Sequence, residues 1–166
     1  MPEQYQLLDG VRLEDSFLYE LYASTRADEL AAWGWEEPMA DAFLRMQWTA
    51  QRQSYSLQFP DADDLLIQVS ERQAGRCLLH RTSSCLRIVD IALLPQYRNQ
   101  GVGTGIIRGL MEQASRSGLP VELSVSTANR AGRLYERLGF AAIDVSDTYI
   151  MMRWTPSPMP GTHSFP

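Results

Sequence analysis

A glycine-containing loop between a predicted strand and a predicted helix constrains this chain more than any other feature. The loop covers residues 95–105, follows the mostly apolar run 86–94, and leads into a helix whose apolar residues recur three and four positions apart. A helix N-terminus offers free N–H groups and the positive end of the helix dipole, and glycines let a backbone approach an anion closely. The loop therefore predicts a phosphate-binding turn, with Arg98 as an additional cationic contact.

Two widespread phosphate-binding motifs do not fit this loop. The dinucleotide fingerprint G-x-G-x-x-G fails because Ile106 stands where the third glycine belongs. The P-loop fails because no Gly-Lys-Ser/Thr is present. A tight turn whose glycines serve only helix packing remains an alternative.

The rest of the chain predicts a mixed α/β fold. Apolar stripes predict helices at 17–22, 39–50, 106–114 and 131–138, with a second short helix starting near Thr25 and Pro38 in a first helical turn. Short apolar runs predict strands at 65–69, 76–81, 86–94, 121–125, 140–145 and 148–154, with a turn at 73–75. The first three strands suggest an antiparallel meander. The order strand, loop, helix, strand after residue 86 predicts a βαβ unit with two parallel strands.

Composition narrows the class of protein. The 166 residues suffice for one domain, which we place at 1–154, followed by a proline-rich tail at 155–166. The net charge of -5 and the pI near 5.0 argue against nucleic acid or an anionic membrane as partner. The two cysteines, Cys77 and Cys85, are too few for a disulfide scaffold or a four-thiolate metal site, so we expect reduced thiols, no metal and a cytoplasmic location.

Two motifs in order indicate a family. Arg98-Asn99-Gln100-Gly101-Val102-Gly103 matches the acetyl-CoA signature R/Q-x-x-G-x-G/A, and Leu134-Tyr135-Glu136-Arg137-Leu138-Gly139-Phe140 matches a second, downstream motif. The chain therefore resembles the GCN5-related N-acetyltransferase (GNAT) superfamily, strongly over residues 65–154. The resemblance implies the GNAT acyl-CoA N-acyltransferase fold, a mixed central sheet splayed at the acetyl-CoA site and flanked by helices.

The resemblance also implies which residues bind acetyl-CoA. The pyrophosphate would lie on the loop backbone, and the pantetheine arm would run beside the preceding strand. The implied residues are Ile91, Ala92, Leu93, Arg98, Asn99, Gln100, Gly101, Val102, Gly103, Thr104 and Asn129. Asn129 departs from the Asn-x-x-Ala spacing of many relatives by one residue, and capping the following helix is an alternative role for it.

The resemblance implies a reaction in which an amine attacks the thioester directly, without an acyl-enzyme. It also implies two catalytic residues. Tyr135 matches the general-acid tyrosine, and a phenol can protonate a departing thiolate. Packing in the core is the alternative role for this side chain. Asp90 interrupts an apolar strand where relatives often carry a carboxylate. It can act as a base through water, anchor the acceptor's ammonium, or form a structural ion pair with an arginine.

We therefore expect an N-acetyltransferase that transfers acetyl from acetyl-CoA to a primary amine of a small molecule or a peptide. Alternatives are a transferase that uses another acyl-CoA, such as succinyl-CoA, and a non-catalytic CoA-binding module. The superfamily places its acceptor site at the N-terminal helices, where Trp33, Trp35, Glu36 and Glu37 suit a cationic amine. A packed tryptophan loop with a solvated acidic edge is the alternative. Relatives often dimerise, so a homodimer is a further expectation.

Overall fold

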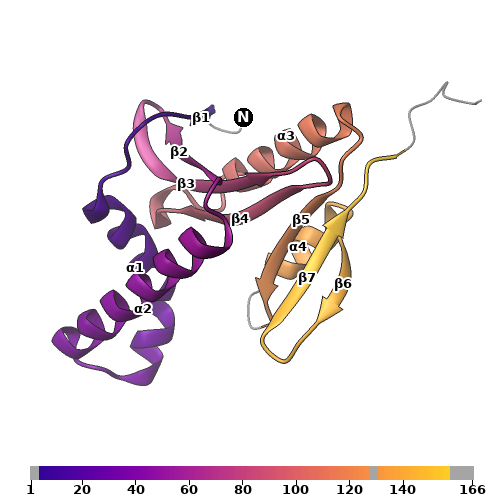
Figure 1. Ribbon diagram of the computed structural model, residues 1–166. Helices are drawn as coiled ribbons and strands as arrows, with labels where there is room; N and C mark the ends of the chain where they lie inside the picture. Colours follow the sequence, from indigo (N-terminus) through magenta and orange to yellow (C-terminus); the bar gives the residue numbers. More distant parts are fainter. Residues whose placement is uncertain (1–3, 128–130, 158–166) are drawn as a thin grey trace, which may run out of the picture. The chain divides into compact units, whose positions relative to one another are not determined.

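The computed structural model describes residues 4–127 and 131–157. Contacts within the chain divide it into two compact units. The first unit comprises Met1–His80 and Val89–Gly103, and the second comprises Arg81–Ile88 and Thr104–Pro166. Figure 1 shows the helices and strands of each unit along the chain.

The strands of the first unit follow the order β1-β2-β3-β4. β1 (Tyr5–Leu8) pairs antiparallel with β2 (Asp63–Val69), and β2 pairs antiparallel with β3 (Arg72–Arg81). β4 (Leu86–Leu93) enters this unit at Val89. The predicted strands are present and the pairing of β2 with β3 fits the predicted meander, whereas β1 was not predicted from its four residues.

The turn between β2 and β3 lies at Ser70 and Glu71, so the predicted turn at 73–75 is wrong. Both turn residues have positive φ, 49° and 64°, as in a tight two-residue hairpin. Gly75 lies inside β3, where a Cβ would stand 2.1 Å from the carbonyl oxygen of Ala92. This glycine therefore permits a close approach of two backbones and does not mark a turn.

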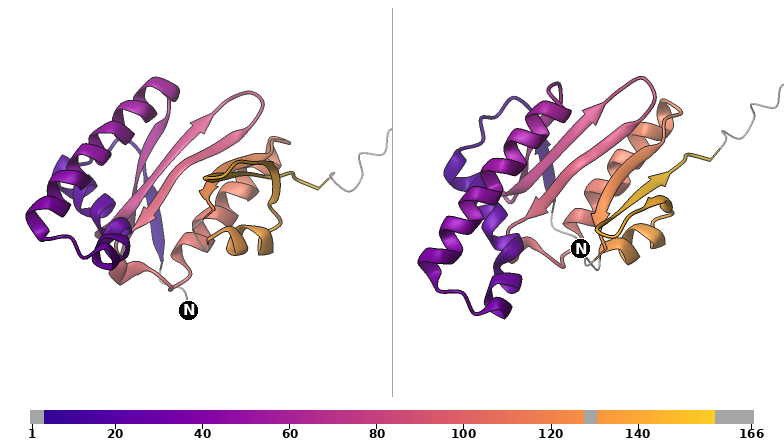
Figure 2. Two further views of the ribbon diagram at one scale, coloured as in Figure 1. Left: turned by 90° about the horizontal axis from the view of Figure 1, so that it is seen from below. Right: turned by 60° about the horizontal axis from the view of Figure 1, so that its bottom comes forward.

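Two long helices cover one face of the first unit's strands. α1 (Asp15–Trp33) and α2 (Glu37–Gln58) lie side by side, as Figure 2 shows. Their apolar side chains bury against residues of β2 and of the segment that follows β4, because one face of each helix is apolar. This core consists of Phe17, Leu18, Leu21, Trp48, Leu66 and Leu94.

The structure corrects two predictions for these helices. α1 is continuous, so the predicted second helix near Thr25 is wrong: the Thr25 hydroxyl donates to the carbonyl of Tyr22 at 2.7 Å, back along its own helix. α2 begins with Pro38 in its first turn, as predicted. Its predicted apolar stripe is wrong in part, because Met39 and Met46 are 62% and 63% exposed. Leu44 and Trp48 provide the buried face of α2 instead.

The second unit orders its strands β4-β5-β7-β6. β5 (Val121–Ser126) pairs parallel with β4 and antiparallel with β7 (Tyr149–Trp154), which pairs antiparallel with β6 (Ala141–Val145). Helix α3 (Val102–Arg116) connects β4 to β5, which confirms the predicted βαβ unit. Helix α4 (Ala131–Arg137) contacts β5.

The mixed α/β fold is confirmed. In the second unit the core side chains include Ile106, Ile107 and Leu110 of α3, Val121 and Leu123 of β5, and Met152 of β7. Within the described residues, no helix has the length and apolar character needed to cross a membrane.

Candidate active site

The candidate site begins where β4 ends. The single-turn helix η1 (Pro95–Tyr97) follows β4, and residues 98–101 then lead into α3. The sign of φ alternates in this loop, with -80° at Arg98, 61° at Asn99 and 82° at Gly101. Asn and Gly enter the left-handed region at the least cost, and such alternation can turn successive N–H groups toward one side. The loop therefore has a backbone suited to binding an anion.

Tyr97 and Arg98 donate their backbone N–H groups to the carbonyls of Leu94 and Pro95, whereas the following residues of the loop have no such contact with the described residues. Outside helices and strands, no backbone hydrogen bond is donated by residues 99–103. The first N–H groups of an α-helix also lack intrahelical acceptors. A Cβ on Gly103 would meet only the Leu93 Cδ1 within 4 Å, at 3.9 Å. Free donors and open space beside Gly103 fit the phosphate groups of coenzyme A.

Arg98 has a structural contact that its place in the motif did not reveal. Its Nε donates to the carbonyl of Leu93 at 2.9 Å, and its Nη2 donates to the hydroxyl of Ser24 at 3.0 Å. Ser24 belongs to α1, and its hydroxyl donates to the carbonyl of Leu21 at 2.7 Å. The guanidinium thus ties α1 to the end of β4, and its role as a phosphate contact stays a prediction.

The remaining predicted acetyl-CoA residues lie near the loop or outside the described ranges. Ile91, Ala92 and Leu93 end β4, beyond the stretch Leu86–Ile88 that pairs with β5. The Gln100 side chain donates to the carbonyl of Gln96 at 2.8 Å and braces the loop. Val102 and Thr104 belong to the first turn of α3, and Asn129 lies outside the described residues.

Asp90 lies in a row of three charged side chains on neighbouring strands of the first unit. Arg76 of β3 makes a two-pronged contact with Asp64 of β2, with Nε–Oδ1 at 2.7 Å and Nη2–Oδ2 at 3.2 Å. The Arg76 Nη1 lies 3.8 Å from the Asp90 Oδ2, which is ion-pair distance but too long for a hydrogen bond. The side chains of Arg76 and Asp90 are only 13% and 28% exposed.

Burial raises the pKa of Asp90 above the usual carboxyl value. The charge of Arg76 opposes this, the charge of Asp64 adds to it, and the backbone N–H of Ile91 opposes it through a hydrogen bond, with a net upward shift. Of the three roles left open, the ion pair with an arginine is present, and a raised pKa is also what a general base near neutral pH requires. Neither Asp64 nor Arg76 was predicted as a functional residue from the sequence, where Asp64 was expected to cap a turn before the strand; it lies inside β2 instead.

Tyr135 lies on α4, in the second unit. Its ring centroid is 5.9 Å from that of Phe140, with the planes inclined by 58°. The backbone N–H of Phe140 donates to the carbonyl of Tyr135 at 2.9 Å. The side chain is half-buried, so it packs without being enclosed, and its role as a general acid stays a prediction.

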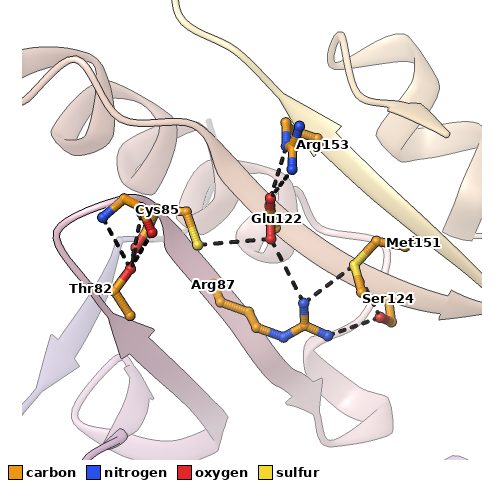
Figure 3. Close-up of polar contacts among 8 residues, drawn as sticks. Thr82, Cys85, Arg87, Glu122, Ser124, Met151 and Arg153 are labelled. Carbon is orange, nitrogen blue, oxygen red and sulfur yellow. Dashed lines mark hydrogen bonds and ion pairs between the residues drawn. The ribbon is translucent and has the colours of Figure 1, made fainter. Parts of the chain in front are cut away.

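A second polar network, within the second unit, was not predicted from the sequence (Figure 3). Glu122 of β5 accepts hydrogen bonds from Arg153 of β7 at 2.6 and 2.8 Å, and Arg87 of β4 lies 4.0 Å from it. The three residues are direct partners in the strand register, so the network ties β4, β5 and β7 together. Burial and the charge of Glu122 raise the pKa of the Cys85 thiol, and neither cysteine forms a disulfide within the described residues.

The predicted acceptor residues lie at the turn between α1 and α2. Trp33 and Trp35 are exposed and form an aromatic cluster with Phe43, with ring centroids 4.9 to 6.3 Å apart. Glu36 and Glu37 are exposed beside them and make no ion pair with the described residues. The cluster combines aromatic rings with free carboxylates, as a site for a cationic amine requires.

The sequence matches a family model, described as the acetyltransferase (GNAT) family, over residues 17–140. The chain belongs to the GNAT family. The matched range includes the loop before α3, Asp90 and Tyr135, and it confirms the family that the two motifs indicated. No curated protein matches this GNAT chain.

Solved structures resemble this GNAT chain over most of its length. PaiA N-acetyltransferase from Thermoplasma acidophilum, in complex with coenzyme A, has a TM-score of 0.66 at 16% identity and covers 92% of this chain and 99% of its own. PH1933 from Pyrococcus horikoshii has a TM-score of 0.65 at 16% identity, covering 93% and 100%. The ribosomal-protein-S18-alanine N-acetyltransferase from Escherichia coli has 0.59 at 18% identity, covering 98% and 100%. At these identities the similarity establishes the fold.

Proposed function

We propose that this GNAT chain is an N-acetyltransferase that transfers acetyl from acetyl-CoA to a primary amine of a small molecule or a peptide. The observation that carries the proposal is the loop between β4 and α3, where Asn99 and Gly101 are left-handed and, among the described residues, the amides of residues 99–101 donate no hydrogen bond outside helices and strands. Two solved relatives support it: PaiA in complex with coenzyme A, and a GNAT family acetyltransferase from Elizabethkingia anophelis with acetyl-CoA bound.

In this proposal the chain binds acetyl-CoA mainly through its backbone. The amides of residues 99–104 would hold the pyrophosphate, and the backbone of 91–93 would hold the pantetheine arm. The net charge of -5 gives no general attraction for a polyanion. Local N–H groups at the start of α3 must therefore supply the favourable interaction.

Asp90 would accept one proton from the acceptor's ammonium, directly or through water. The neutral amine then forms a C–N bond with the carbonyl carbon of the thioester. The nitrogen's second proton leaves to water and Asp90 returns its proton to water, so the transfer releases one proton overall once the thiolate has been protonated. The raised pKa of Asp90 supports this role because a base is most effective when its pKa lies near the working pH.

Tyr135 would assist the leaving group. When the C–S bond breaks, the sulphur departs as a thiolate, and the Tyr135 hydroxyl gives it a proton. Tyr135 then regains its proton from water. An acyl-enzyme is not part of the proposal, because the chain contains only two histidines, His80 and His163, and neither forms a recognisable nucleophile–base motif in the sequence.

Gly103→Glu tests the acetyl-CoA site. A Cβ fits at Gly103, so we expect the variant to fold but to lose coenzyme A binding by at least about tenfold, because a carboxylate would enter the phosphate position. Isothermal titration calorimetry with coenzyme A measures the loss. Gln113→Glu is the matched control, since it adds the same charge to an exposed position of the same helix. Equal affinity of both variants would contradict the assignment.

Tyr135→Phe separates an enzyme from a binding module. We expect coenzyme A affinity to be kept and turnover to fall by about 10²-fold or more, because the general acid is lost. Turnover is read as thiol release with a panel of amines and peptides. The sequence contains no lysine, so the protein has no side-chain amine that could act as acceptor. Thiol release with none of these acceptors would favour the binding module, and faster release from succinyl-CoA would favour another acyl donor.

A further inference from the structure

We propose that Asp64 and Arg76 are positioning residues that set the charge state of Asp90, with Asp64 holding the Arg76 guanidinium away from a direct hydrogen bond to Asp90. The inference rests on the proposed function, in which Asp90 accepts a proton from the acceptor. It assigns a role to two residues that no motif of the sequence singled out.

The geometry of Arg76 shows how its donors are divided. Nε and Nη2 form the two parallel contacts with the Asp64 carboxylate, at 2.7 and 3.2 Å. A two-pronged contact of this kind fixes the plane of the guanidinium. The remaining Nη1 approaches Asp90 only to 3.8 Å. Asp90 therefore lies near a positive charge without receiving its hydrogen bond.

The three side chains share one face of the strands. Arg76 is the register partner of Leu66, and Leu66 packs in the core beneath α1 and α2 together with Ala92. Asp64 and Asp90 each lie two residues before a member of this core, so they point to the same face. The helices contribute apolar side chains there, Phe17, Leu21 and Trp48. The charges that act on Asp90 come from Asp64 of β2 and Arg76 of β3.

Two carboxylates share one guanidinium in this row. Asp64 accepts both direct hydrogen bonds from Arg76, whereas Asp90 accepts neither of them and is the carboxyl whose pKa burial raises. Removing the charge of Asp64 takes away a like charge near Asp90 and weakens the contact that fixes Arg76. Both effects lower the pKa of Asp90. Removing the charge of Arg76 favours protonated Asp90. The two changes must therefore move the titration of Asp90 in opposite directions.

Carboxyl-carbon NMR titration of the full chain tests this coupling without activity, with Asp90→Asn identifying the signal. We expect Asp64→Asn to move the Asp90 midpoint to lower pH and Arg76→Gln to higher pH, each by roughly half a unit or more. Asp61→Asn is the matched control, an exposed aspartate just before β2, and leaves the midpoint unchanged. Asp64→Glu keeps the charge and restores the native midpoint. If Arg76→Gln does not fold, the midpoint of Asp90 in Asp64→Asn alone tests the proposal.

The pH profile of kcat/KM then tests the role in acetyl transfer. Because a base must be ionised, the rise of kcat/KM with pH should move to lower pH in Asp64→Asn and to higher pH in Arg76→Gln. Midpoints that do not move beyond the Asp61→Asn control overturn the proposal. An Asp90 signal that moves while the kcat/KM profile stays fixed also overturns it and leaves the acetyltransferase function intact. Absence of acetyl transfer in the native chain instead rejects the function, and the NMR titration still decides the coupling.

Discussion

At the scale of single residues, glycines that look alike in the sequence do different things. Gly75 suggested a turn, yet it lies in β3 against the carbonyl of Ala92. Gly101 does bend the loop before α3, with a φ of 82°. The sequence shows where the glycines are. Whether a glycine permits a bend of its own backbone or the close approach of another strand depends on the backbone packed against it.

Gly75→Ala should lower the free energy of unfolding by about 1–3 kcal/mol, because the added methyl forces the backbones of β3 and β4 apart. Urea unfolding followed by circular dichroism measures the change. Gly103→Ala is the control: its Cβ has room and lies in a helix, so we expect no loss of stability. A Gly75→Ala protein as stable as the native chain would show that the close approach is not a constraint.

At the scale of elements, side-chain contacts of Arg98 hold the loop of the candidate site to the end of β4 and to α1. Arg98 joins the end of β4 to α1 through Leu93 and Ser24. The strand, the loop and the helix α3 were all predicted from the sequence. The contact with α1 was not, because a contact across 74 residues depends on how α1 packs.

Arg98→Gln should destabilise the protein by about 1–3 kcal/mol, since two hydrogen bonds from a charged group are lost. Ser24→Ala should cost less, because the contact with Leu93 remains. Arg108→Gln provides the reference, as Arg108 is an exposed arginine of α3 without an ion pair to the described residues. Thermal unfolding of the four proteins compares them. Equal stability of Arg98→Gln and Arg108→Gln would mean that the contact contributes nothing.

At the scale of the whole molecule, the protein has a net negative charge, and the ligand that we propose for it, coenzyme A, is also negatively charged. The net charge of -5 repels coenzyme A at long range, whereas the free amides of the loop attract it only at short range. Raising the ionic strength from about 10 mM to 150 mM shortens the Debye length from about 30 Å to 8 Å and screens mainly the repulsion.

The association rate of coenzyme A should therefore stay constant or rise over this range of salt, as measured by stopped-flow fluorescence. The four tryptophans of the chain supply the signal. Sodium chloride and potassium chloride should act alike, because the effect is one of screening. A rate that falls steeply with salt would indicate a basic surface that steers the ligand, and would contradict a site built from backbone amides.

The family, the mixed α/β class and the position of the loop before α3 could be predicted from the sequence, and the resemblance to the family implied Asp90 and Tyr135 as a catalytic pair, which stays a prediction. The first three follow from spacing along the chain, which fixes local backbone structure and motif identity. The contacts of Arg76 with Asp64 and Asp90 could not be predicted from the sequence, because they depend on the register of β2 against β3. The register is set by the turn at Ser70 and Glu71, which lacks the Asn, Asp or Gly that two positive φ angles favour, and a turn at 73–75 would have placed other side chains opposite Arg76.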